Sequence, residues 1–281
     1  MPTSEVSPLV IGLLLAAAVI HATWNALVKG SEDRLASICV ISLFGALATI
    51  PFLFVFEAPT KASWPYMFGS GALQVGYCLF LVRAYQLGDL AQVYPIARGS
   101  APLLVTLGAF ALAGEFPQGF GLIGIALVCL GIAMLASGVG RASPKAVLAA
   151  LATGGFIASY MVVDGLGVRV AGSATGYAAW QALVGNGLVA SVYLVIRRQP
   201  LPIPRTKRGA QTAVAGALGA LGYCIAVWAM SGTGMGSVSA LRETSIVFAA
   251  LIGIVFLKER MTAQKWIGVA TVTAGVISLS I

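Results

Sequence analysis

The chain has 281 residues, of which 59% are hydrophobic and only 9% are charged. This composition excludes an ordinary soluble domain, in which about 25% of residues are charged. The formal net charge of +8 does not indicate nucleic-acid binding, because the basic residues gather in short loops beside apolar segments. We therefore expect an integral membrane protein that contacts the lipid bilayer and has no nucleic-acid partner.

Apolar windows of about 20 residues, long enough to cross a hydrocarbon core about 30 Å thick, recur along the whole sequence. They predict ten transmembrane helices, at residues 7–28, 35–56, 65–87, 91–113, 117–138, 144–164, 173–196, 209–230, 236–257 and 262–280. Barrel strands would be about half as long and would alternate strictly. The first window follows a segment without Lys or Arg, so we interpret it as a retained helix and not as a signal peptide. The predicted fold class is an all-α, multi-pass protein of the cell (inner) membrane.

The first predicted helix carries a polar stripe. His21, Asn25 and Lys29 recur every four residues and so share one face, with Trp24 beside them. Lipid offers these groups no partner, so the stripe should face the interior of the bundle. Either it lines a substrate cavity, or His21 and Asn25 only bond a neighbouring helix while Lys29 reaches the interface.

The fourth predicted helix places an arginine inside an apolar window. Tyr94 and Arg98 lie on one face, and Pro95 and Pro102 remove backbone donors on either side of the arginine. Freed carbonyl groups are tolerated at membrane depth only where neighbouring helices or water satisfy them, which favours a cavity. Tyr77 in the third predicted helix could line the same cavity, although aromatic residues in such helices also serve packing.

The sixth predicted helix repeats the pattern of the first. Tyr160 and Asp164 have helical spacing, and aligning the two helices pairs Tyr160 with Trp24. The same alignment places Asp164 one residue before the counterpart of Lys29, so the second copy presents an acid where the first presents a base. Asp164 either faces the cavity or caps the end of its helix, and the sequence leaves both readings open.

The segment around Arg98 recurs 144 residues later around Arg242, which makes the chain an internal duplication. The same ungapped offset relates Glu115 to Glu259, Gly124 to Gly268 and Gly131 to Gly275. We expect two domains, at residues 1–140 and 141–281. Since each contains five helices, an odd number, the second copy must cross the membrane in the opposite sense. The prediction is therefore two inverted five-helix repeats around a central cavity.

A buried arginine costs roughly 2.5–3.5 kcal/mol on insertion scales, so arginines at equivalent places in both copies indicate a functional site. Guanidinium groups bind carboxylate, phosphate or phosphonate through paired hydrogen bonds. Arg98 and Arg242 on opposite walls of one cavity would favour an anionic or zwitterionic substrate. Alternatively, the arginines are neutralised within the protein, Arg242 by Glu243 or both by helix carbonyl groups. Adjacent helical residues point apart, which disfavours the pairing of Arg242 with Glu243.

The substrate-binding candidates are His21, Trp24, Asn25, Tyr77, Tyr94, Arg98, Tyr160, Arg242 and Glu243. Glu115 and Glu259 lie in tight turns, where we expect each acid to cap the next helix. The cysteines at 39, 78, 129 and 224 have no metal-ligand spacing such as CxxC and are expected to be small core residues. No metal ion or cofactor is expected.

Three features together are typical of a known family. They are the two five-helix halves, the motif Tyr94-Pro95-Ile96-Ala97-Arg98-Gly99, and the turns Gly114-Glu115 and Lys258-Glu259-Arg260 before a glycine-rich last helix. In these features the chain resembles the EamA-like branch of the drug/metabolite transporter superfamily. The resemblance implies a ten-helix carrier with a cavity lined by the first, third, fourth, sixth, eighth and ninth helices. It leaves the substrate open among amino acids, nucleotide sugars, polyamine-like cations and drugs.

We predict a secondary transporter, a permease or exporter, that moves a small polar metabolite such as an amino acid, organic acid or phosphonate by alternating access. Glu243, Asp164 or His21 could couple transport to protons, but exchange or facilitated diffusion fits the same residues. An intramembrane enzyme is disfavoured by the lack of HExxH, of an acidic cluster for Mg²⁺ and of a nucleophile-base pair. A non-transport membrane subunit would not need the buried arginines.

Orientation has two opposing indications. The loops after odd-numbered predicted helices carry most of the Lys and Arg, with five of them between residues 197 and 208. Basic loops stay cytoplasmic, so this distribution predicts both termini outside. The family resemblance implies cytoplasmic termini instead.

Overall fold

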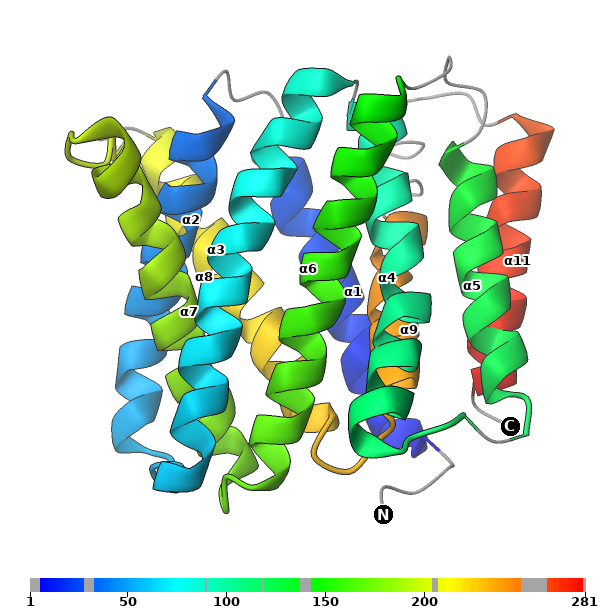
Figure 1. Ribbon diagram of the computed structural model, residues 1–281, viewed down its shortest axis with the longest axis horizontal. Helices are drawn as coiled ribbons and strands as arrows, with labels where there is room; N and C mark the ends of the chain where they lie inside the picture. Colours follow the sequence, from blue (N-terminus) through cyan, green and yellow to red (C-terminus); the bar gives the residue numbers. More distant parts are fainter. Residues whose placement is uncertain are drawn as a thin grey trace.

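The computed structural model describes residues 6–27, 33–88, 90–117, 119–136, 143–203, 207–248 and 262–279. Within these ranges the chain forms α-helices and two short 3₁₀ helices, η1 (Ile50–Phe54) and η2 (Lys61–Ser63). The α-helices are α1 (Pro8–Leu27), α2 (Arg34–Thr49), α3 (Trp64–Leu87), α4 (Leu90–Ala113), α5 (Gly121–Ala136), α6 (Pro144–Arg169), α7 (Ala174–Arg197), α8 (Lys207–Ala229), α9 (Met235–Glu243) and α11 (Ala263–Leu279). Figure 1 shows them standing side by side as one bundle.

Each predicted window contains one of these helices, so the all-α membrane fold is confirmed. Of the described helices, six are both long and apolar enough to span a bilayer, and α1, α5 and α11 contribute shorter apolar stretches. Two boundaries differ from the prediction. Helix α6 continues to Arg169, five residues past its predicted end, and the predicted helix at 236–257 is interrupted after Glu243, with its residues beyond 248 outside the described part of the chain.

Side-chain caps begin several helices where the sequence places Asp or Ser. Asp33 Oδ1 accepts a hydrogen bond from the Ala36 amide at 3.0 Å, and the Ser143 hydroxyl accepts one from Ala146 at 3.2 Å. Each cap satisfies an amide that has no partner within its helix. These caps fix the starts of α2 and α6.

Helix packing follows the inverted duplication. Helix α3 packs against α6, and α8, which is the helix equivalent to α3 in the second repeat, packs against α1. The other equivalent helices pack directly against each other, α2 on α7, α4 on α9 and α5 on α11. Exchanging the two halves therefore reproduces the same contacts. The described helices thus form two inverted repeats, whereas the exact division at residues 1–140 and 141–281 stays a prediction.

Helices α5 and α11 lie side by side in Figure 1, and the glycines at their contact follow the same symmetry. A Cβ atom on Gly124 would lie 2.8 Å from the Gly275 carbonyl oxygen, and one on Gly131 would lie 2.8 Å from that of Gly268. The 144-residue offset pairs Gly124 with Gly268 and Gly131 with Gly275. The two repeats therefore exchange these contacts: the equivalents of Gly124 and Gly275 are Gly268 and Gly131, which form the other contact. A two-fold relation between the repeats requires this exchange. The small residues also let the two backbones approach closely.

Replacing Gly131 by alanine should therefore destabilise the bundle. The added Cβ would lie 2.8 Å from both the Gly268 oxygen and the Val272 backbone nitrogen, which cannot move aside as a flexible side chain could. We expect a cost of about 1–3 kcal/mol and a melting temperature lowered by several degrees in detergent. Gly155→Ala is the matched control, because nothing lies within 4 Å of its added Cβ. Equal melting temperatures for the two variants would contradict the close approach.

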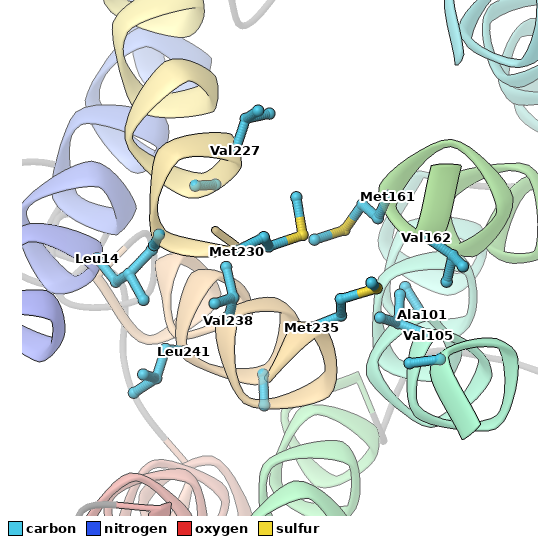
Figure 2. Packing of buried hydrophobic residues seen from close by; sticks show 14 of the residues in the cluster. Leu14, Ala101, Val105, Met161, Val162, Val227, Met230, Met235, Val238 and Leu241 are labelled. Atoms are coloured by element: carbon cyan, nitrogen blue, oxygen red, sulfur yellow. The ribbon is translucent and has the colours of Figure 1, made fainter. Parts of the chain in front are cut away.

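An apolar layer closes one end of the interior. Figure 2 shows Met161 from α6, Met230 just after α8 and Met235 from α9 extending into the space between these helices. All three side chains are fully buried. Met230 and Met235 lie where α8 ends and α9 begins, at the lower end in Figure 1, and Met161 lies eight residues before the end of α6. Methionine is unbranched and adapts its shape to its neighbours, so it seals an irregular gap well.

Candidate functional site

Arg98 of α4 and Glu243 of α9 form an ion pair inside the bundle. The Arg98 Nε atom lies 2.7 Å from Glu243 Oε2, and the side chains are 5% and 0% exposed. At this distance the two charges interact directly. Arg98 Nη2 and Glu243 Oε1 have no hydrogen-bond partner in the described part of the chain. The pair therefore has hydrogen-bonding capacity left for a ligand or water.

The ion pair lies at a short turn within the helix predicted at 236–257. Helix α9 ends at Glu243, Thr244 forms a turn, and residues 245–248 are helical again. The Thr244 hydroxyl donates to the Leu241 carbonyl oxygen at 2.6 Å. Thr244 keeps right-handed helical backbone angles, so the helix tightens over one turn beside the ion pair and then continues.

Arg242 faces an aromatic ring and a sulfur atom. Its guanidinium carbon lies 4.9 Å from the centre of the Tyr223 ring, and Nη1 lies 3.9 Å from Met161 Sδ. Within the described residues no carboxylate lies within 4.0 Å of Arg242. Glu243 makes its close ion pair with Arg98 of the other repeat, so Arg98 is the arginine that a carboxylate neutralises directly. Arg242 lies within electrostatic range of the same carboxylate without a close ion pair among the described residues.

Tyrosines surround the two arginines. Tyr160 packs edge-on against Tyr77 and against Tyr223, with ring centres 6.0 Å and 5.9 Å apart. The Arg98 guanidinium carbon lies 5.9 Å from the centre of the Tyr94 ring. The structure thus brings four of the predicted site residues close together: Tyr77, Tyr94, Arg98 and Tyr160.

Tyr223 belongs to this group and was missed from the sequence. A repeat signal could have found it, because Gly76-Tyr77-Cys78 in α3 recurs as Gly222-Tyr223-Cys224 in α8. The offset there is 146 residues instead of 144, so an ungapped comparison passes over it. Both equivalent tyrosines contact Tyr160.

Asp164 of α6 is fully buried in a shell of hydroxyl groups. Its carboxylate accepts hydrogen bonds from Ser70 at 2.7 Å, from Tyr177 at 3.0 Å and from the Tyr223 hydroxyl. The capping alternative is wrong, because α6 continues beyond Asp164. Tyr223 donates to Asp164 while its ring faces Arg242, so it connects the two charged groups. No pattern in the sequence identified Ser70 or Tyr177 as a partner of Asp164.

The polar stripe of α1 reaches the same region through His21. Both Arg98 and Arg242 lie within electrostatic range of its imidazole. The side chains of Trp24 and Asn25 lie outside the described residues, although their backbone belongs to α1. Lys29 and Glu259 also lie outside the described residues.

Glu115 closes the end of the interior beside the methionine layer. It pairs with Arg169, and its Oε2 atom accepts a hydrogen bond from the Met235 amide at 3.1 Å. Arg169 Nε in turn donates to the Met230 carbonyl oxygen at 3.0 Å. The prediction that Glu115 caps a helix is correct, but the helix is α9 of the other half and not the next one. These contacts tie the two repeats together at one membrane face.

The inverted helical repeats and the buried charges define a multi-pass membrane carrier. The profile of the EamA-like transporter family matches residues 8–137 and 144–281, and the chain belongs to this family, within the drug/metabolite transporter superfamily. It is a membrane transporter and not an enzyme. A solved crystal structure, described only as that of a protein, has the same fold, with a TM-score of 0.80 at 18% identity over 97% of this chain and 98% of that one. No curated protein matches the sequence.

Proposed function

We propose that this transporter moves a small zwitterionic metabolite of the amino-acid type across the membrane by alternating access. The observation that carries the proposal is the Arg98–Glu243 pair, in which a buried cation and a buried anion face each other with hydrogen-bonding atoms left over. A buried ion pair is stable only when further hydrogen bonds offset its desolvation. A zwitterion supplies both an acceptor for the arginine and a donor for the glutamate.

Charge matching favours a zwitterion over a simple anion. A substrate carboxylate would bind Arg98 or Arg242, whose planar groups suit bidentate contacts. A plain anion would also meet the carboxylate of Glu243, which is fully buried and repels negative charge. An ammonium group beside Glu243 removes that repulsion. The tyrosines around the arginines would enclose the apolar part of the substrate.

The closed end of the interior fits one state of an alternating cycle. Glu115, Arg169 and the methionine layer seal the side where α9 begins. Because the repeats are inverted, an equivalent rearrangement of the other half would open this side and close the opposite one. A ligand shifts a conformational equilibrium only when it binds one state more tightly than the other. A substrate that binds Arg98 and Glu243 in place of their mutual contact would therefore shift the equilibrium between the two open states.

Counterflow in proteoliposomes loaded with an amino-acid mixture tests the substrate class. We expect a zwitterionic amino acid to compete for exchange, and its N-acetyl and carboxamide derivatives to compete roughly ten- to a hundredfold more weakly. Each derivative removes one charge-assisted interaction of about 1.5–3 kcal/mol. A diamine should not compete. If the diamine competes best, or if the N-acetyl derivative matches the amino acid, the zwitterion assignment fails.

We further propose that Asp164 couples this transport to protons. Its carboxylate is fully buried, and its hydrogen-bonding partners are hydroxyl groups, which can rotate to accept or donate as the acid gains or loses a proton. Ionisable groups at membrane depth commonly serve proton relays. Tyr223 would transmit the change to Arg242, because it contacts both residues.

A further inference from the structure

A crevice on the outside of the bundle is separate from the transport site. It lies between the start of α2 and the ends of α3 and α7, at the upper end of Figure 1, and has a volume of about 690 Å³. Its lining includes two arginines at the start of α2 and the end of α7, Arg34 and Arg197, which we call the rim, and three apolar residues, Leu79, Val82 and Ile196, which we call the wall. The crevice thus joins a basic rim to an apolar wall.

The rim has positive charge available for a ligand. The Arg34 guanidinium lies 4.9 Å from the centre of the Tyr85 ring, and no described acid lies within 4.0 Å of it. Arg197 Nη2 lies 3.9 Å from Asp33 Oδ2, and this pair is about half exposed, so it contributes little stability. Asp33 also caps α2 through Oδ1. Among the described residues, the two arginines therefore face one acid, which is already engaged.

The wall residues Leu79 and Ile196 are exposed on helices that are long and apolar enough to span the membrane. Leu79 and Ile196 are 40% and 51% exposed, as lipid-facing side chains are. Leu79 lies eight residues before the end of α3, so the wall extends about 12 Å inward from the helix end. A soluble anion would have no use for this apolar depth, whereas a lipid acyl chain would fill it. The basic rim would lie at the height of the headgroups.

We propose that this crevice binds an anionic phospholipid, with its phosphate at Arg34 and Arg197 and its upper acyl chain along Leu79, Val82 and Ile196. Phosphate accepts paired hydrogen bonds from guanidinium groups, and the aromatic face of Tyr85 holds Arg34 in place. The bound lipid would bridge α2, α3 and α7, which come from both repeats.

Native mass spectrometry of the full chain, purified from mixed micelles of phosphatidylglycerol and phosphatidylcholine, tests the site. The unmodified protein should retain phosphatidylglycerol in preference to phosphatidylcholine. The variant Arg34→Gln/Arg197→Gln should retain it roughly thirtyfold less, because each basic residue beside an anionic lipid contributes about a fivefold factor. Lys145→Gln is the matched control, since Lys145 is an exposed cation at the start of α6, outside the crevice.

A second variant keeps the charges and removes the space. Leu79→Trp should fill the wall and reduce retention of phosphatidylglycerol while the arginines remain, and it tests the site even if the double variant fails to fold. Equal retention of the two lipids by the unmodified protein would overturn the proposal, as would full retention by either variant. Complete displacement by glycerol phosphate would also overturn it, because the site would then bind a soluble phosphate and not a lipid.

Discussion

Arg98→Ala should abolish transport and lower the melting temperature of the purified protein together. The substitution leaves the fully buried Glu243 carboxylate without its cation, and breaking one side of a buried pair costs about 3–5 kcal/mol. Arg98→Lys should keep the fold, since the charge remains, but weaken substrate binding roughly ten- to a hundredfold, since a point charge does not replace the planar fork. Melting curves and counterflow kinetics measure the two effects separately.

A double variant separates the structural from the functional role of this pair. Arg98→Met/Glu243→Met removes both charges and leaves apolar side chains, so most of the lost stability should return. Transport should not return, because the substrate would find neither of its partners. Arg83→Ala is the control for removing an arginine, since Arg83 is exposed on α3 and bonds only Gln86 among the described residues. If the double variant transports with normal affinity, the ion pair is structural and the zwitterion site lies elsewhere.

Asp164→Asn should abolish accumulation driven by a pH gradient while exchange of substrate across the membrane continues. Asparagine keeps the shape of the side chain and can still accept hydrogen bonds from Ser70 and Tyr177, but it cannot carry a proton. With one proton per substrate and a gradient of one pH unit, accumulation should fall from about tenfold to none. Uptake of labelled substrate into proteoliposomes, with and without the gradient, measures the change.

Tyr177→Phe is the matched control for this prediction. It removes one of the hydroxyl groups bonded to Asp164 and leaves the acid in place, so coupling should persist. If Asp164→Asn loses exchange and gradient-driven uptake to the same extent, the residue supports folding or binding. If both activities survive, transport is not proton-linked through Asp164.

The sequence predicted those features of the site that depend on one residue and its own helix. An arginine in an apolar window costs free energy wherever its helix packs, so Arg98 and Arg242 could be identified without a structure. The partners of these arginines could not be identified from the sequence. Glu243 follows Arg242 in the chain, yet its partner is Arg98 in the other repeat. Only the rotation of α4 and α9 about their axes brings these side chains together, and packing against neighbouring helices sets that rotation.

The sequence by itself determined the class of protein, because the bilayer imposes helices on apolar windows and an odd number of helices per copy inverts the second copy. The tertiary structure decided where the turn after α9 falls, which tyrosine lies between Asp164 and Arg242, and which half Glu115 caps. These features join residues that are distant in the chain. Local propensity and hydropathy carry no information about such contacts, since they arise only when the two repeats pack against each other.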